Sequence, residues 1–244
     1  MRGVWPIFYR ELLILRSRLW RQLANYAVSP LLYIIAFGWG MGRGVTMEGV
    51  EYLAYMLPGL MALSSMSRSF GISSEINIAR FYWHTFEEFQ TSPISPAAIA
   101  LGEVLGGMVR GLLGAVVVVC LALLNGVKLH YGSVLWLGLL VNCFMFASAA
   151  VWAAMVVRSH ADQSNLTGFI ITPMSFLCGT FFSLDKLPAW AAAVINTLPL
   201  THASHFIRAS ALGQSPPWLS LAVMALYAAV FFAMAVWHVR KASI

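Results

Sequence analysis

Six long apolar runs divide this chain, and each is long enough to cross a lipid bilayer as a helix. They cover residues 23–41, 52–72, 97–124, 133–157, 164–184 and 218–238. A helical span needs roughly 20 mostly apolar residues, because hydrocarbon offers no partner to backbone polar groups outside a helix or a closed barrel. The pattern therefore predicts an all-α integral membrane protein with six transmembrane helices.

The composition agrees with lipid as the main solvent of the chain. Of its 244 residues, 60% are hydrophobic and only 10% are charged, whereas a soluble domain has about 25% charged residues. The runs and their short connections use nearly the whole sequence. We therefore expect one transmembrane domain over residues 1–244, with no separate soluble domain.

The positive charges predict the orientation of the chain. Arginine and lysine gather in residues 2–21, 68–80, 158 and 240–241, at the edges of apolar runs. The positive-inside rule places such segments in the cytoplasm. Both termini are therefore expected there, and the net charge of +6 is explained without a nucleic-acid partner.

The first 22 residues are predicted to form an amphipathic helix in the membrane interface. Trp5, Phe8, Leu12 and Leu15 recur at helical spacing and fall on one stripe. Aromatic side chains on such a stripe sit at headgroup level. The alternative is a basic flank of the first span that serves topology alone.

Residues 73–96 form the longest polar interruption, and the predicted topology places them in the cytoplasm. This segment carries Phe81, Phe86 and Phe89 beside the acidic pair Glu87 and Glu88. An amphipathic helix with an aromatic and acidic face is suited to docking in a partner's groove. The alternative is a helix that lies on its own bundle.

Residues 185–217 are apolar enough to suggest a seventh span, but their polar and proline residues argue against one. Pro188, Pro199, His202, His205 and Arg208 interrupt the segment. An odd number of spans would also move the basic C-terminus outside. We expect an extracytoplasmic pair of short helices that dips into the outer leaflet and returns.

The third apolar run contains two charged residues, Glu103 and Arg110, seven residues apart and so on nearly the same helical face. Charges at membrane depth are costly and usually face a bundle interior or a wet path. Two interpretations stay open: an ion pair that positions helices, or contact of Arg110 with an anionic part of a substrate. Gly102, Gly106 and Gly107 in the same run predict close helix packing.

Enzyme motifs are missing from the sequence. A P-loop needs a lysine after glycine, and none of Lys128, Lys186 and Lys241 follows one. His202 and His205 with Asp185 are the one combination that suggests an intramembrane enzyme. That possibility, and a passive channel or scaffold, are the alternatives to the interpretation below; no metal site is expected.

Three motifs carry a resemblance to a known family. They are LPGL at residues 57–60, TSPISP at 91–96 running on to LGEV at 101–104, and TPMSFLCGTFFSLDKLPAW at 172–190 followed by LPLTH at 198–202. Over essentially its whole length the chain resembles the type-2 membrane permeases of ATP-binding-cassette (ABC) exporters. It is most similar to the branch that exports polysaccharides, lipo-oligosaccharides and some drugs.

The resemblance implies a permease that performs no covalent chemistry itself and holds no cofactor. Two permease subunits, expected to be identical, would meet two cytoplasmic ATPase subunits that bind ATP and magnesium. The chain would lie in the bacterial inner membrane and export an amphipathic substrate, such as a lipid-linked saccharide, a polysaccharide or a drug.

The resemblance also implies a coupling helix at about residues 80–91. The residues expected to contact the ATPase are Arg80, His84, Glu87, Glu88, Arg10 and Glu11. The resemblance supplies no transferable motif for substrate contacts. The residues expected along the substrate pathway, from the sequence itself, are Arg110, Glu103, Phe181 and Phe182.

Overall fold

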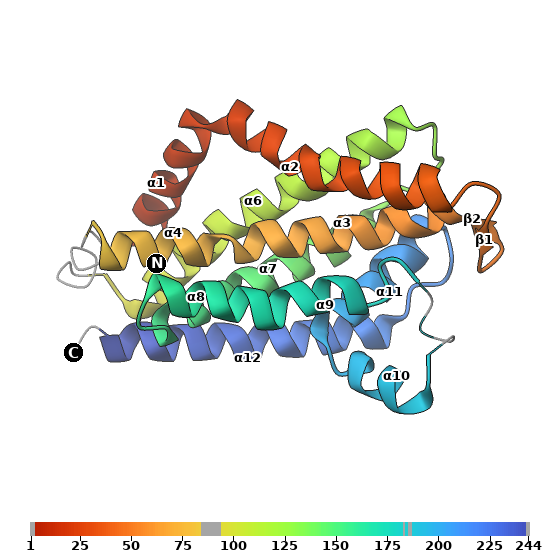
Figure 1. Ribbon diagram of the computed structural model, residues 1–244. Coiled ribbons are helices and arrows are strands. Elements are labelled where there is room, and N and C mark those ends of the chain that lie inside the picture. The colour runs from red at the N-terminus through yellow and green to blue at the C-terminus, as the bar shows by residue number, and fades with distance from the viewer. Residues whose placement is uncertain (1–2, 84–93, 183, 185–186, 243–244) are drawn as a thin grey trace.

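The protein is a bundle of helices, and a small β-hairpin lies at one end of it (Figure 1). The computed structural model describes residues 3–83, 94–182, 184 and 187–242. Its long helices are α2 (Leu19–Tyr33), which continues as the π-helix η1 (Ile34–Met41), then α3 (Tyr52–Phe70), α6 (Pro96–Leu124), α7 (Ser133–Val156) and α12 (Trp218–Ala242). The shorter elements are α1 (Val4–Ser17), α4 (Ile72–Phe81), α8 (His160–Leu166), η2 (Thr167–Ile171), α9 (Thr172–Leu177), α10 (Ala189–Asn196) and α11 (Pro199–Ala211).

Within the described residues, four helical segments are long and apolar enough to cross a membrane. They are Leu19–Met41, Pro96–Leu124, Ser133–Val156 and Trp218–Lys241. The all-α class is thus confirmed, whereas the number of six spans is not. α3 has the length, but the serines and Arg68 in its last turns lower its hydropathy. The fifth predicted span is divided among α8, η2 and α9, and its last helix ends at Leu177.

α3 lies at the centre of the bundle and packs against α6, α7 and α11. Most of its side chains are buried, including Tyr55 and Met61. Glycines on α6 permit the close approach: a Cβ atom at Gly107 would lie 2.9 Å from the Cβ of Ala147 on α7. At Gly102 it would lie 2.8 Å from the Cβ of Ile7 on α1. The predicted close packing at these glycines is therefore confirmed.

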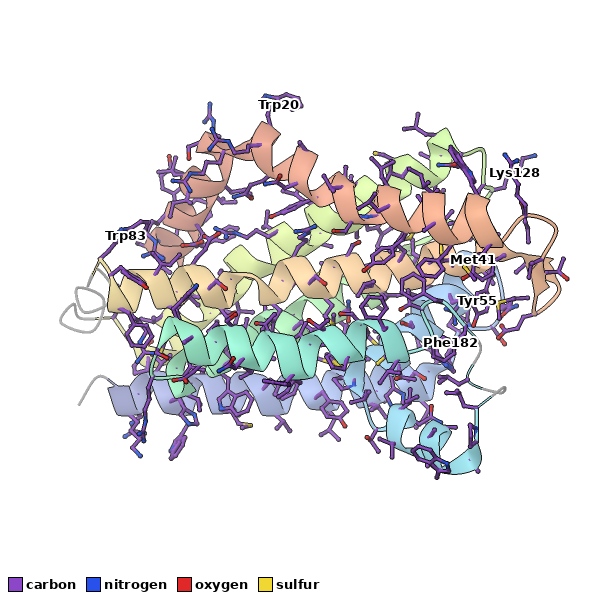
Figure 2. All side chains as sticks on the ribbon, in the orientation of Figure 1. Trp20, Met41, Tyr55, Trp83, Lys128 and Phe182 are labelled. Atoms are coloured by element: carbon purple, nitrogen blue, oxygen red, sulfur yellow. The ribbon has the colours of Figure 1, made fainter. Side chains whose placement is uncertain are left out.

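The polar connections gather at the two ends of the bundle. Figure 1 shows both ends of the chain, the end of α4 and the start of α6 at one end. The hairpin of β1 (Thr46–Met47) and β2 (Val50–Glu51) lies at the other end, as does α10. In Figure 2, Trp83 marks the first end, and Met41 and Lys128 mark the second.

The N-terminal helix is shorter than the predicted segment of residues 1–22. It ends at Ser17, the backbone turns at Arg18, and α2 begins at Leu19. The face of α1 that meets the bundle carries Ile7, Glu11 and Leu15. The exposed rings of Trp5 and Tyr9 stack on one another, 6.1 Å apart.

Candidate functional site

Glu11 on α1 is the centre of a buried cluster of charged side chains. Its residue is 3% exposed, and both carboxylate oxygens accept hydrogen bonds. Arg10 donates to Oε1 over 2.7 Å, and Arg110 on α6 donates to Oε2 over 2.7 Å. Because both oxygens are engaged inside the protein, Glu11 ties the N-terminal helix to the bundle.

Arg110 joins a third helix to the same cluster. Its guanidinium is 3% exposed and forms a second ion pair with Glu75 on α4. The position of Glu11 between α1 and α6 depends on Gly106, where a Cβ atom would lie 2.8 Å from the Cγ of Glu11. Arg110 therefore connects α1, α4 and α6 at one buried point.

Glu103 completes the cluster through Arg10, which donates to its Oε1 over 2.8 Å. The residue is 1% exposed, and its Oε2 has no hydrogen-bond partner among the described residues. Glu103 and Arg110, predicted to share a face, are thus linked through Arg10 and Glu11. Three carboxylates and two guanidiniums meet here, and removing one member of such a buried group is strongly destabilising.

A second polar network fixes α4 to α8. Asn77 donates to the side-chain oxygen of Gln163 over 3.0 Å, and Gln163 donates to the hydroxyl of Ser73 over 2.9 Å. All three residues are buried. Since α4 leads directly to residues 84–93 and α6 begins just after them, both flanks of this segment are anchored by buried polar contacts.

Of the residues expected to contact an ATPase, the structure places Arg80, Arg10 and Glu11. Arg80 donates a hydrogen bond to the carbonyl of Ala154 at the end of α7, and its guanidinium lies 5.0 Å from the ring of Phe81. His84, Glu87 and Glu88 lie outside the described residues. Their contact with a partner stays a prediction.

Phe181 belongs to an aromatic cluster between the first and fifth predicted spans. Its ring centroid lies 5.0 Å from those of Tyr33 and Phe37 and 6.0 Å from that of Phe176. The Tyr52 hydroxyl donates to the Phe181 carbonyl over 2.9 Å. These contacts form one aromatic cluster, in which Phe181 is buried and Phe176 is exposed at its edge.

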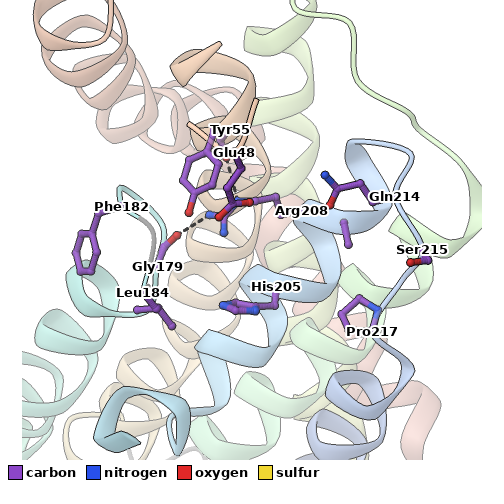
Figure 3. A pocket seen from close by; sticks show the side chains of 11 residues that line it. Glu48, Tyr55, Gly179, Phe182, Leu184, His205, Arg208, Gln214, Ser215 and Pro217 are labelled. Carbon is purple, nitrogen blue, oxygen red and sulfur yellow. Dashed lines mark hydrogen bonds between the residues drawn. The ribbon is translucent and has the colours of Figure 1, made fainter. Parts of the chain in front are cut away.

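Two of the three segments that carry the family resemblance meet around Arg208 on α11, the helix that begins within LPLTH. Figure 3 shows its guanidinium between Tyr55 of α3 and Gly179. Arg208 Nη2 donates to the Gly179 carbonyl over 2.5 Å, Nε donates to the Tyr55 carbonyl over 3.2 Å, and the guanidinium lies 3.9 Å from the Tyr55 ring. A Cβ atom at Gly59 would lie 3.0 Å from Nη2. A glycine from each of two motifs therefore makes room for Arg208 or accepts its hydrogen bond, and Arg208 itself lies beyond the LPLTH sequence on the same helix.

Arg208 also lines a cavity of about 220 Å³ at the hairpin end of the bundle. Phe182, Glu48, His205 and Gln214 line the same cavity. His202 and His205, which with Asp185 suggest an intramembrane enzyme, lie on α11. Asp185 lies outside the described residues. Within the described chain, no group of three or more potential metal ligands was found.

Sequence reasoning missed the two partners that organise these sites. In the sequence, Glu75 is one residue of the polar interruption at 73–96, and Arg208 argues only against a seventh span. A buried Arg110 needs a carboxylate partner, and this need is a signal that could have suggested Glu75. The sequence does not show that α4 brings Glu75 close enough to Arg110 to be that partner. Gly59 and Gly179 were visible inside the motifs, yet nothing local pointed to Arg208.

Comparison with known proteins identifies the family of the chain. Residues 3–212 match the family described as ABC-2 type transporter. The chain is 26% identical over 221 residues to the inner membrane transport permease YadH of Escherichia coli K12, covering 88% of this chain and 86% of that protein.

Two further relatives carry more specific names. The daunorubicin resistance ABC transporter permease protein DrrB1 of Streptomyces coeruleorubidus is 27% identical over 219 residues, which are 86% of this chain and 76% of the relative. Nodulation protein J of Rhizobium meliloti is 28% identical over 235 residues, 91% of this chain and 88% of the relative. The chain therefore belongs to the ABC-2 type transporter family, as the membrane permease subunit of an exporter whose ATPase is a separate chain.

Proposed function

We propose that this permease exports an amphipathic substrate, such as a lipid-linked saccharide, a polysaccharide or a drug, as one half of a homodimer in a bacterial inner membrane. The names of the relatives support this range, since one is a daunorubicin resistance permease and another a nodulation protein. The aromatic cluster around Phe181 would meet the apolar part of such a substrate. ATP and magnesium would bind to the partner ATPase, of which two copies are expected.

The proposed topology has six spans and cytoplasmic termini. The second and fifth spans are then α3 and the run of α8, η2 and α9, and residues 185–217 form the extracytoplasmic re-entrant segment. Two observations support it. The chain ends and the flanks of residues 84–93 share one end of the bundle (Figure 1), and the last turns of α4 and α12 at that end carry Arg80, Arg240 and Lys241.

The observation that carries the mechanism is the anchoring of both flanks of residues 84–93. Closure of the ATPase dimer on ATP would move the coupling helix at about residues 80–91. Through Glu75 and Arg110, that motion would reach α6 and α1 together. A path for the substrate would open by alternating access or as a lateral channel, because ATP binding favours one of two permease states.

The contacts of Arg110 favour the interpretation in which it positions helices through ion pairs. Its ion pairs with Glu11 and Glu75 already use its charge inside the protein. Contact between Arg110 or Glu103 and a substrate stays a proposal. It requires these ion pairs to open during transport.

The double variant Glu87→Arg, Glu88→Arg tests the coupling segment. It should insert and fold normally yet lose the co-purifying ATPase, because the proposed acidic contact is reversed in sign. Glu51→Arg, a charge reversal on the hairpin at the opposite end, is the matched control and should retain the ATPase. If the double variant keeps an intact complex at moderate salt, the coupling assignment is wrong.

A further inference from the structure

Arg68, in the last turn of α3, carries a positive charge that no carboxylate among the described residues offsets. Its Nη2 donates to the Asn25 carbonyl over 3.3 Å, and its guanidinium carbon lies 4.4 Å from the centroid of the Tyr26 ring. Both partners are neutral, so the charge stays uncompensated. Ionisable residues inside a span usually pair with one another or mark the path of a substrate or ion.

The contrast with Arg110 shows what is unusual about Arg68. Arg110 is the arginine that the sequence offers for an anionic substrate, but inside the protein it is paired with Glu11 and Glu75. Arg68 has no such pair, and its buried Nε has no hydrogen-bond partner among the described residues. A guanidinium has five N–H donors, so one bond to a carbonyl leaves most of its capacity for the oxygen atoms of a ligand.

Three helices hold this side chain in position. Gly114 on α6 makes room for it, since a Cβ atom there would lie 2.8 Å from the Cγ of Arg68. On α2, the Tyr26 hydroxyl donates to Oε1 of Gln22 over 3.1 Å, which fixes the ring beside the guanidinium. The Arg68 side chain is nevertheless only partly buried. It is therefore both placed by the fold and accessible.

Arg68 lies where two helices separate. Figure 1 shows α2 and α3 close together near the hairpin and apart toward the end that holds α1. Arg68 belongs to the last turn of α3 and contacts Asn25, six residues after the start of α2. In the proposed topology this is the cytoplasmic side of the second span. A headgroup in the cytoplasmic leaflet would meet the guanidinium between the two helices.

The same face of α2 leads from Arg68 to the aromatic cluster around Phe181. Tyr26 and Tyr33 are seven residues apart, which is two helical turns and about 10 Å. The Tyr33 ring centroid lies 5.0 Å from that of Phe181. A positive charge is thus followed along one helix face by aromatic side chains, an order that suits an anionic headgroup with an apolar chain.

We propose that Arg68 binds the phosphate of an amphiphile whose apolar part lies along α2 toward Tyr33. Arginine suits this role because its planar group of donors matches phosphate oxygens. The identification of this amphiphile as exported substrate rests on the proposed function.

Native mass spectrometry of the purified permease, with its ATPase where the two co-purify, tests this proposal with two lipid probes. They are short-chain phosphatidic acid and the diacylglycerol with the same chains, which differ only by the phosphate. The wild type should bind phosphatidic acid roughly tenfold more tightly, the scale of one hydrogen bond to a charged group. Equal binding of the two probes would overturn the proposal.

Variants locate this preference. Arg68→Gln should bind the two probes alike, whereas Arg68→Lys should keep a preference for phosphatidic acid because it keeps the charge. Arg43→Gln, the same change at an exposed arginine near the hairpin, should behave as the wild type. An undiminished preference in Arg68→Gln, or an equal loss in Arg43→Gln, would overturn the assignment.

A purely structural role of Arg68 gives a different result. Arg68→Gln would then melt at a lower temperature and bind both probes more weakly by the same factor, with the preference unchanged. That outcome would also overturn the proposal.

The effect of ATP on the intact complex identifies the source of the phosphate group. A bound lipid that stays in place during turnover is a resident bilayer lipid, and one that ATP releases is cargo; the site stands in both cases. The preference between the probes is measurable on the permease alone. Failure to co-purify an ATPase would therefore count against the proposed function without affecting this result.

Discussion

The buried carboxylate of Glu11 accepts a 2.7 Å hydrogen bond from the guanidinium of Arg110, although 99 residues separate them in the chain. This pair joins the N-terminal helix to the third predicted span. Through Glu75 it extends to the helix that leads into residues 84–93. The segment expected to meet the ATPase is thereby connected to two other helices by one side chain.

Arg110→Ala should therefore destabilise the permease strongly. It leaves Glu11 buried without its partner and removes the ion pair of Glu75, and breaking a buried pair costs about 3–5 kcal/mol. Thermal unfolding in detergent should show a clear loss for Arg110→Ala and almost none for Arg43→Ala, at an exposed arginine. Similar melting of the two variants would show that the cluster contributes little.

Activity measurements separate the two interpretations of Arg110. If its role is structural, Arg110→Ala lowers basal and substrate-stimulated ATP turnover of the complex by the same factor. We expect this outcome because its charge is paired within the protein. Loss of the stimulation alone would assign Arg110 to the substrate pathway.

Gly106→Ala should displace α1 from α6. Its new Cβ atom would lie 2.8 Å from the Cγ of Glu11, closer than real Cβ contacts allow. Gly168→Ala is the control, since no heavy atom lies within 4 Å of its Cβ position, and alanine is the better helix former by about 1 kcal/mol. Melting temperatures should therefore fall for Gly106→Ala and stay equal or rise for Gly168→Ala. A fall in both would contradict the packing argument.

Gln163→Ala should loosen α4 from α8. It leaves Ser73 and Asn77 without their partner in a buried setting, where an unsatisfied polar group costs about 1–3 kcal/mol. Hydrogen exchange of α4 should become faster in this variant. Unchanged exchange would show that the network does not hold the helix.

The pattern of apolar residues predicted the bounds of the longest helices well. It did not predict where a helix would break. Residues 97–124 and 133–157 match α6 and α7 within one residue at each end, because continuous hydrophobicity is a local property. The fifth span differs because the chain forms the π-helix η2 and then ends its helix before Gly179, whose φ is +72°. The composition of the run does not reveal such a break.

The sequence predicted those charged residues that stand out locally, and it did not predict their partners from distant segments. Glu103 and Arg110 were recognisable as costly charges in an apolar run, and both are members of the buried cluster. Glu75 and Arg208 were not, since their partners come from distant segments. The three motifs are visible in the sequence, whereas the meeting of Gly59 and Gly179 at Arg208 is a property of the fold.

Cysteine labelling tests the proposed topology. In a Cys120→Ala background, Lys128→Cys should react with a membrane-impermeant maleimide in intact cells, because it marks the hairpin end of the bundle (Figure 2). Trp83→Cys, at the other end, should react only after the cells are opened. The reverse pattern would place both termini outside.

The most direct test of the central claim is affinity purification of the tagged wild-type chain from its native host in mild detergent. The account predicts that a soluble P-loop ATPase accompanies it in a one-to-one ratio. Repeated absence of any such ATPase, with the permease folded and dimeric, would contradict the account.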